Sequence, residues 1–491
     1  MAVLDNFLLS HQIDSAHFNI GGHLTPISIR DQMLRGRLIV ARAIENDLIA
    51  AGRRLLIVGA GVGGITAAMY AATAGVDVTL MEQKGRPFDR HHSCGRVVNP
   101  TQYDWQLAHW DEGMLPFSGT PPMLLAWPKP DRATFLTGNW LAQYNTFKIT
   151  PDGRNINERF RTKFLRAQPS PSAPGPLNVE FQELDQTGHP IGLVRDEHFH
   201  MLISAIGFGE ERCFLYKTHP FRGFEFWAND PYEQAGLTWK AQSIIKKRVV
   251  ISGAGDGALQ DFLRIVTKKS CAFDIWKSLD LASVIGSDVL GKELRTLSDE
   301  DVHASRALHW GNCEGHDHPV LDRVHDIYQK TVEKIYNLRG VADACQAIVR
   351  DDAASIALVH PCSHFGNVYG LNRFLSNLFM LRLKESGMNV HYPKARVFDV
   401  KCNHALGSKP DSMVCDGESH VVSICPAPDC YIMTDPASYS QSTSPACTQD
   451  LDCEVVVMRH GLIPPALVRV DDPAVELSRT RQMLPYFFPG A

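Results

Sequence analysis

The clearest pattern near the start of the chain is a short apolar run that ends in glycine, an Ala-rich stretch and a second apolar run. Residues 26–50 alternate apolar and charged positions at helical spacing and predict one amphipathic helix. RLLIVGA then predicts a buried parallel strand, GGITAAMYAATAG a helix that ends at Gly75, and VDVTLMEQ the next strand. Together these stretches predict one βαβ unit.

The rest of the chain repeats this order of elements. Residues 101–150 read as irregular, and 169–176 as a surface linker. After the linker, the pattern predicts a β-meander and a strand ending at Gly207, followed by a second strand and glycine turn from residue 246. A helical insertion is predicted at 276–350 and an amphipathic helix at 371–388. Two more meander strands and a strand ending at Gly461 complete the pattern. Each glycine turn thus has its own meander and apolar strand, which indicates a tandem architecture.

The first glycine turn fits the spacing G-x-G-x-x-G between a strand and a helix. Gly59 permits the tight turn, Gly61 lets a pyrophosphate approach the backbone, and Gly64 lets the helix pack closely on the strand. Gly63 lies in the same turn. The phosphates then face the helix N-terminus, where free N–H groups and the helix dipole favour anions. Glu82, at the end of the second strand and followed by Gln83, is placed to accept hydrogen bonds from a ribose diol.

The second glycine turn is a weaker match. Gly253, Gly255 and Ala258 occupy the three motif positions, with Asp256 and Gly257 between them. CAFDIW reads as the next strand, and the residue after it is Lys277, so no acid stands where a ribose ligand is expected. Lys268, Lys269 or Lys277 would attract a 2′-phosphate and favour NADPH over NADH. The alternative is a degenerate Rossmann half retained for structure.

With these two glycine turns, the chain resembles flavoproteins with two dinucleotide-binding domains, and the resemblance covers most of residues 53–465. GAGVGG with Glu82 resembles the FAD turn, ISAIGFG (through Gly207) the strand before the NAD(P)H domain, GAGDGA the NAD(P)H turn, and VVVMRHG (through Gly461) the strand after which the chain returns to the FAD domain. The resemblance implies FAD at the first turn and NADPH or NADH at the second.

The stretch SCGRVVNPTQYDW also resembles a segment of amine-oxidase-like flavoproteins that lines the pyrophosphate and the flavin ring. By that resemblance Arg96 pairs with the FAD pyrophosphate, a suitable role for a guanidinium. Asn99, Tyr103, Asp104 and Trp105 would lie near the isoalloxazine. A packed loop with an aromatic plug is the alternative for these residues.

Arg459 and His460 are the candidate catalytic residues, because the resemblance places this strand end at the flavin. A cation there would stabilise reduced anionic flavin. The alternative is a surface arginine and a capping histidine.

Two departures leave the subfamily open. The Cys-x4-Cys pair of disulfide reductases is missing after the first turn, where only Cys94 occurs, and the signature of flavin-containing monooxygenases is absent between the turns. CPAPDC (425–430) has the right spacing but lies far away. HWGNCEGHDH (309–318) contains metal-ligand residue types, but its spacing matches no structural zinc pattern, so no metal is expected.

Composition limits the class of partner. The 491 residues carry a net charge of −5, with 21% charged and 44% hydrophobic residues, which is ordinary for a globular protein and gives no reason to expect nucleic acid as a partner. The scattered cysteines predict reduced thiols in a cytoplasmic protein, and no apolar run is long enough to span a membrane. A small-molecule substrate is expected, and an oligomer is compatible with these features.

We therefore expect an α/β fold in which an FAD-binding Rossmann domain is interrupted by a second Rossmann-like domain with a helical insertion. The expected boundaries are a helical lead-in at 1–52, the first part of the FAD domain at 53–240, the NAD(P)H-like domain at 241–390, and a return to the FAD domain at 391–491. The expected activity is NAD(P)H-linked oxidoreduction of a small organic molecule, with a monooxygenase favoured. An amine-oxidase-like flavoenzyme with a silent second turn and a non-catalytic FAD- or NAD-binding module are the alternatives.

Overall fold

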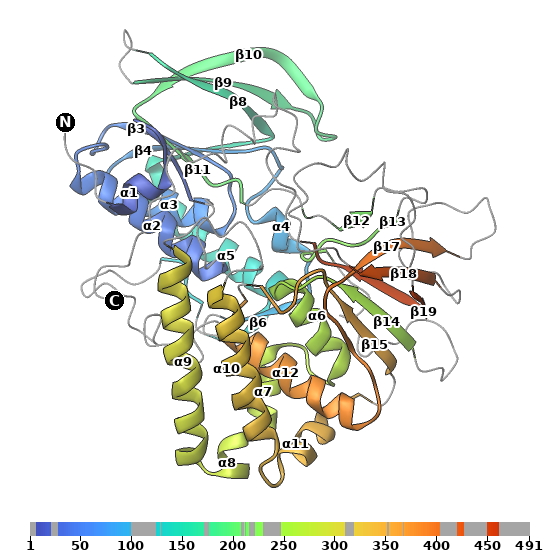
Figure 1. Cartoon of the computed structure of the whole chain (residues 1–491). Coiled ribbons are helices and arrows are strands. Elements are labelled where there is room, and N and C mark those ends of the chain that lie inside the picture. Colours follow the sequence, from blue (N-terminus) through green and yellow to red (C-terminus); the bar gives the residue numbers. More distant parts are fainter. Residues whose placement is uncertain are drawn as a thin grey trace. The chain divides into compact units, whose positions relative to one another are not determined.

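In a computed structural model, the chain forms two compact units (Figure 1). The structure describes residues 6–20, 28–99, 124–127, 129–170, 176–207, 211, 213–215, 221–228, 247–309, 319–350, 353–366, 368–402, 420–426 and 449–460. Of these, the first unit contains the residues up to Gly95 and those from 124 to 207. The second contains 96–99 and the residues from 211 to 460.

The first unit is built on a six-stranded sheet in the order β1-β2-β11-β3-β4-β7. Its strands are β1 (Gln12–Asp14), β2 (His17–Asn19), β3 (Arg54–Val58), β4 (Asp77–Glu82), β7 (Ile156–Phe160) and β11 (Met201–Ser204). All neighbours pair in parallel except β1 and β2. The expected buried parallel strand at 54–58 and its βαβ unit are confirmed, since β3 is buried between β11 and β4.

Helices cover this sheet and pack closely where glycines meet. They are α1 (Asn6–His11), α2 (Ile29–Glu45), α3 (Val62–Thr73), α4 (Asp89–His92), α5 (Ala133–Lys148) and the short 3-10 helix η3 (Asp152–Asn155). The predicted helix within 26–50 is confirmed as α2. A Cβ atom on Gly36 of α2 would overlap the carbonyl oxygen of Gly63 in α3, so the two backbones touch at the first turn of α3.

Two expectations for the first unit are wrong. The lead-in at 1–52 is not only helical, because β2 pairs in parallel with β11 and extends the sheet. The stretch 101–150 is not irregular throughout, because α5 occupies 133–148. Leu136, Trp140 and Tyr144 recur every fourth residue along α5 and are buried, which is the spacing that a helix needs to present one apolar face.

A three-stranded antiparallel meander completes the first unit. Its strands are β8 (Thr162–Pro169), β9 (Leu177–Leu184) and β10 (Pro190–Phe199), in the order β10-β9-β8. The short strand β6 (Asp131–Arg132) precedes α5. Phe164, Val179 and Phe181 of the meander share a core with Leu56 and Leu202 of the large sheet. The expected meander is confirmed, and β8 is a strand that sequence reasoning missed.

The second unit repeats the plan with a four-stranded parallel sheet in the order β16-β15-β14-β20. The strands are β14 (Lys247–Ser252), β15 (Ala353–Val359), β16 (His391–Tyr392) and β20 (Val455–Met458). Its meander, β17 (Ala395–Cys402), β18 (His420–Pro426) and β19 (Gln449–Cys453), is the expected one. The short strands β5 (Val97–Val98), β12 (Phe214–Leu215) and β13 (Phe221–Arg222) also belong to this unit.

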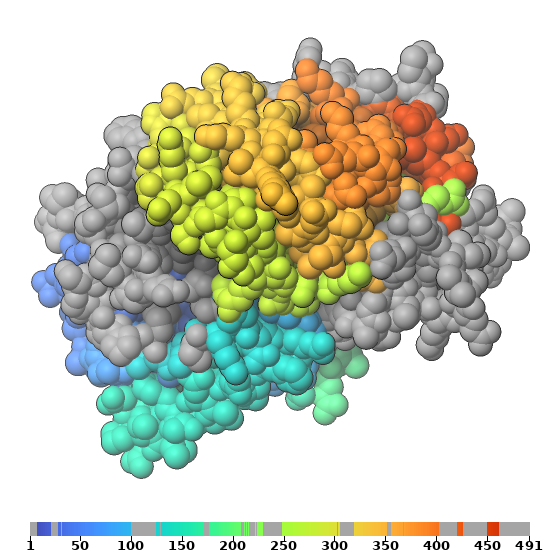
Figure 2. Space-filling view, turned by 90° about the horizontal axis from the view of Figure 1, so that it is seen from below, coloured from blue at the N-terminus to red at the C-terminus, as the bar shows by residue number. Residues whose placement is uncertain are grey.

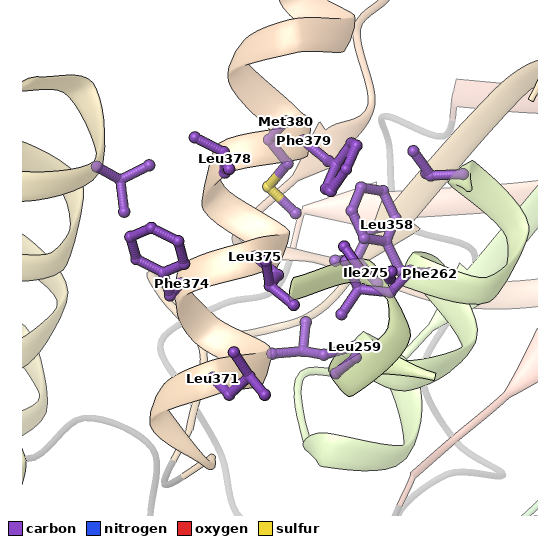
Figure 3. Close-up of a cluster of buried hydrophobic side chains, with 14 of the residues drawn as sticks. Leu259, Phe262, Ile275, Leu358, Leu371, Phe374, Leu375, Leu378, Phe379 and Met380 are labelled. Atoms are coloured by element: carbon purple, nitrogen blue, oxygen red, sulfur yellow. The ribbon is translucent and has the colours of Figure 1, made fainter. Parts of the chain in front are cut away.

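Helix α6 (Asp256–Val266) follows β14, and the predicted helical insertion follows α6. The insertion consists of α7 (Ala272–Leu279), α8 (Leu281–Ile285), α9 (Ser287–His309), α10 (Pro319–Tyr336) and α11 (Val341–Ile348), so its helical character is confirmed. Figure 2 shows α9 and α10 beside α12 (Gly370–Glu385) as one continuous surface. Figure 3 shows Leu371 and Leu375 of α12 against Leu259 of α6, within the largest core of the unit.

Two expectations for the second unit are corrected. CAFDIW is not a strand but α7, whose buried Ala272, Ile275 and Leu279 recur at helical spacing. The stretch from 391 to 460 does not return to the first unit, because β20 pairs in parallel with β14 and completes the second sheet. Strand β20 occupies beside β14 the place that β11 occupies beside β3, and so the unit closes on itself.

Candidate functional site: two glycine turns

The first glycine turn joins β3 to α3 in a conformation that only glycine tolerates. Gly59 has φ +107°, and a Cβ atom there would overlap the carbonyl oxygen of Ala205 after β11. A Cβ on Gly64 would overlap the carbonyl oxygen of Gly59 itself. Both glycines therefore serve the close approach of backbone segments, as the motif requires.

Gly61 has a different environment, because nothing lies within 4 Å of the position its Cβ would take. It is the N-cap of α3, makes no side-chain capping bond, and precedes a first turn without an acidic residue. The N–H groups at this helix start are thus available to an anion. Gly63, by contrast, packs against the backbone of Gln32 in α2, with its Cβ position 3.1 Å from that carbonyl oxygen.

The carboxylate of Glu82 lies against this turn. Its Oε2 accepts a hydrogen bond from the N–H of Ala60 at 2.8 Å, and its Oε1 accepts one from the N–H of Lys84 at 2.8 Å. The end of β4 therefore turns an acid toward the glycine turn, while Gln83 is exposed. Gly207 has φ +80° and follows β11 at the same carboxyl edge of the sheet.

The open cradle at Gly61 and the adjacent acid fit an adenine dinucleotide such as FAD. The residues present supply backbone donors for a diphosphate and an acceptor for ribose hydroxyls. An ionised carboxylate has about four acceptor positions, and Glu82 uses one on each oxygen for the backbone. Capacity for sugar hydroxyls therefore remains.

The second glycine turn joins β14 to α6 in the same way. Gly253 has φ +144°, and a Cβ there would overlap the carbonyl oxygen of Arg459. Gly255 is the N-cap of α6 and, like Gly61, has nothing within 4 Å of its Cβ position. Ala258 at the third motif position is fully buried. The second turn is therefore also open at its central glycine.

One residue makes the second turn unlike the first. Asp256 lies in the first turn of α6, where α3 carries no acid. Its Oδ1 accepts hydrogen bonds from the N–H of Tyr369 at 3.0 Å and from Nδ2 of Asn372 at 2.7 Å. Burial raises the pKa of this carboxyl to about 6. An acid with a raised pKa therefore lies at the N-terminus of α6.

Three arginines converge on Asp261, one turn further along α6. Its carboxylate accepts from Nη1 of Arg96 at 2.7 Å, Nε of Arg459 at 2.8 Å and Nη1 of Arg264 at 3.1 Å, and all four side chains are buried. Burial by itself would raise the pKa of Asp261, but the arginine charges outweigh it and hold that pKa well below its usual range. Sequence reasoning missed Asp261, and its only signal was an acid and Arg264 three residues apart in the second half of α6, where the neighbouring residues Phe262, Leu263, Ile265 and Val266 are apolar.

The side chain of Arg459 passes the N-terminal turn of α6 and reaches the carboxylate of Asp261. The Cβ position of Gly257 lies 3.3 Å from the ring of Phe226, which is a tight approach, and 3.5 Å from Cδ of Arg459, which is an ordinary contact. The Arg459 guanidinium also donates to the carbonyl of Phe224 at 2.5 Å. Gly257 therefore lies against Phe226 and the side chain of Arg459.

The remaining predicted site residues lie as follows. Arg96 pairs with Asp261, and its guanidinium lies 4.0 Å from the centroid of the Phe226 ring. Asn99 is fully buried.

His460 follows β20, and its Nε2 lies 2.7 Å from Oγ of Ser252 at the end of β14. Arg459 and His460 thus lie at the second glycine turn. Tyr103, Asp104, Trp105 and Gly461 are outside the described residues.

The residue that follows the second strand of the second sheet is His360, not Lys277. Lys277 belongs to α7, where its Nζ lies 4.2 Å from the centroid of the Phe273 ring. His360 is fully buried, and its Nε2 lies 2.7 Å from Nε2 of His391 on β16. Like Lys277, His360 is not an acid, so the residue after this strand offers no carboxylate to a ribose.

The part of the chain that the structure describes contains no group of three or more His, Cys, Asp or Glu residues arranged to hold a metal ion. Most of HWGNCEGHDH and CPAPDC lies outside it. No helix in the described ranges combines the length and apolarity that a membrane span requires.

Several solved structures resemble the chain at low sequence identity. Thioredoxin reductase from T. acidophilum has 11% identity and a TM-score of 0.34, with 84% of this chain and 78% of that chain covered. The bacillithiol disulfide reductase of Staphylococcus aureus has 9% identity and a TM-score of 0.37, with 84% and 78% covered. The ornithine N-hydroxylase of Kutzneria sp. 744 has 11% identity and a TM-score of 0.33, with 85% and 83% covered.

No curated protein matches the sequence. Residues 57–108, which begin inside β3 and include the first glycine turn and Glu82, match the model of the NAD(P)-binding Rossmann-like domain. The parallel order β11-β3-β4-β7 around that turn is the order of such a domain. The chain therefore contains a Rossmann-like domain, part of which matches this model, followed by a second unit of the same α/β plan.

Proposed function

We propose that this protein is an FAD-dependent oxidoreductase acting on a small organic molecule. The observation that carries the proposal is the open position at Gly61, at the uncapped start of α3, with the carboxylate of Glu82 on the same turn. Bound FAD would supply the redox chemistry, and the protein would bind, orient and exclude water.

In this proposal each part of the first turn has one task. The bare backbone at Gly61 admits the diphosphate, and the N–H groups of the first turn of α3 donate to it. Glu82 accepts from the ribose hydroxyls while its bond to Ala60 keeps it against the turn. Gly59 and Gly64 act indirectly, by holding β3, β11 and α3 close together.

The second turn is the proposed site for the nicotinamide nucleotide that reduces the flavin. Gly255 is open at the start of α6, as Gly61 is at the start of α3. His360 offers no carboxylate to select an unphosphorylated ribose, so NADPH is the first nucleotide to test and NADH the second. A monooxygenase remains the favoured reaction within this scheme.

Arg459 and His460 take different roles in the proposal. The guanidinium of Arg459 is held by Asp261 and by the carbonyl of Phe224, so we assign it a positioning role. The imidazole of His460 is only partly buried and is oriented by Ser252 at the carboxyl edge of β14. Of the two, we therefore propose His460 as the residue that contacts a bound nucleotide.

A second candidate is an amine-oxidase-like flavoenzyme whose second turn binds no nucleotide. Asp256 favours it, because an ionised carboxylate in the first turn of α6 opposes a phosphate there. A non-catalytic module that holds FAD or NAD is the third reading of the same geometry.

The test begins with the colour of the purified protein after reconstitution with FAD. We expect a flavin spectrum that bleaches anaerobically with NADPH or NADH and oxygen uptake once a substrate is present. Bleaching by an amine or amino acid alone would support the oxidase, and a stable yellow protein that nothing reduces would support the binding module. A protein that retains no FAD would refute the proposal.

The second turn is tested separately with Gly255→Val. A branched side chain in the open position should abolish reduction by NAD(P)H and leave the flavin content unchanged. Reduction at the wild-type rate would show that the second turn takes no part.

A further inference from the structure

The carboxyl of Asp256 is fixed at the entrance of the second glycine turn. Both of its hydrogen bonds, from the N–H of Tyr369 and from Nδ2 of Asn372, go to the same oxygen, Oδ1. Among the described residues, no hydrogen bond reaches Oδ2, and the side chain is partly exposed. The start of α12 thus holds one oxygen and leaves the other beside the turn.

The position of this acid coincides with the place where a dinucleotide is expected to rest its phosphates. Gly255, the open N-cap, directly precedes Asp256, the first residue of α6. Phosphates bind at the first N–H groups of a helix that follows such a turn. A bound diphosphate and an ionised Asp256 would therefore be neighbours of like charge.

The charged groups around Asp256 do not neutralise it by direct pairing. Arg373 on α12 is buried, and its guanidinium donates to the carbonyls of Phe365 and Gly366. Arg459, after β20, is held by Asp261 of α6, which itself carries a negative charge. The carboxyl of Asp256 is therefore free to gain a proton when a neighbouring anion arrives.

We propose that Asp256 controls the second turn by charge, so that an anionic dinucleotide binds tightly there only when this carboxyl is protonated. The inference rests on the proposed nucleotide site at the second turn and adds a proton to its binding equilibrium. Because burial raises the pKa of Asp256 to about 6, the free site is mostly ionised at neutral pH. Binding then takes up a proton and weakens as the pH rises above 6.

The experiment measures NAD⁺ binding to the FAD-loaded protein from pH 5.5 to pH 8 at constant ionic strength. NAD⁺ is the probe because its diphosphate keeps its charge over this range. Calorimetry in two buffers with different ionisation enthalpies counts the protons. We expect the Kd of the wild type to rise about tenfold from pH 6 to pH 7.5, with uptake of about one proton per nucleotide near pH 7.5.

Asp256→Asn keeps an oxygen for Tyr369 and removes the charge, so its Kd should be independent of pH and lower than the wild-type value at pH 7.5. Asp288→Asn, which removes an exposed acid from the first turn of α9, is the matched control and should bind as the wild type does. The count of protons in the wild type needs no variant and stands even if Asp256→Asn folds poorly.

The outcomes separate this inference from the function on which it rests. Binding with no proton uptake, or with the same pH dependence in wild type and Asp256→Asn, overturns the role of Asp256 and leaves the nucleotide site standing. Absence of NAD⁺ and NADP⁺ binding at every pH, in the wild type and in Asp256→Asn, overturns both.

Discussion

Arg459 donates a hydrogen bond from Nε to Oδ2 of Asp261 across 2.8 Å, and both side chains are buried. The two residues are 198 positions apart in the chain. Arg96, which is 165 positions from Asp261 in the chain, donates to the other oxygen of the same carboxylate. One acid on α6 therefore holds the end of β20 and the segment around Arg96 in place.

Replacing Asp261 should destabilise the second unit strongly. Asp261→Asn leaves Arg96 and Arg459 buried without their carboxylate, and breaking a buried ion pair on one side costs about 3–5 kcal/mol. Urea unfolding followed by circular dichroism measures the loss. Asp288→Asn, at an exposed helix start, is the control and should change stability by less than about 0.5 kcal/mol. A loss no larger than the control's would mean that the cluster contributes little.

Gly61→Val should separate flavin binding from folding. Because nothing lies within 4 Å of the Cβ position, the substitution should leave the unfolding temperature nearly unchanged, whereas the branched side chain blocks a diphosphate. The ratio of flavin to protein absorbance measures the loss. Gly138→Val in α5 adds the same side chain at another open position and should keep its flavin. Full flavin content in Gly61→Val would contradict the assignment of the turn.

Gly64→Ala should show the opposite behaviour, because its Cβ would overlap the carbonyl oxygen of Gly59. The backbone of α3 must shift, and overpacking of this kind costs about 1–3 kcal/mol. We expect a lower unfolding temperature first, with flavin loss as its consequence. A variant that binds no flavin yet unfolds at the wild-type temperature would assign Gly64 to the ligand instead.

Asp301 on α9 should contribute less to the stability of the second unit as the pH rises from 4 to 7. Burial raises the pKa of Asp301 to about 6, above its ordinary value of 3.8. An acid whose pKa is higher in the folded state contributes stability below the unfolded pKa, and that contribution disappears as the pH rises through the folded pKa. Asp301→Asn should therefore be more stable than the wild type at pH 7.5, by about 1–2 kcal/mol, and equal to it near pH 4. Urea unfolding at the two pH values tests the sign. An equal difference at both would exclude titration of Asp301 as its cause.

Local elements followed from the sequence where one short segment held all the information. Strand β3 and the turn at Gly59 were predictable because an apolar run that enters glycine specifies a buried strand and a tight turn within a few residues. The same holds for β14 and the turn at Gly253. The helical insertion was predictable because periodicity over many residues averages out single exceptions.

Errors arose where an assignment depended on distant partners. CAFDIW has the composition of a strand, but it forms part of the helix α7. Its apolar residues pack in the same hydrophobic core as residues of α6 and α12. Because of that error, Lys277 was expected to follow the second strand of the second sheet. In the structure that strand is β15, which comes after α7 to α11, and the residue that follows it is His360. Likewise β20 is apolar enough to enter either sheet, and only its pairing with β14 decides which one.

The sequence by itself determined the two glycine turns, the acid at Glu82 and the paired α/β plan, because each is encoded in residues close together along the chain. Only the tertiary structure decided that Arg96, Arg264 and Arg459 share Asp261, and that Asp256 is fixed by the start of α12. The physical reason is that a charge can be buried only with its partners, and those partners come from segments that meet only after folding.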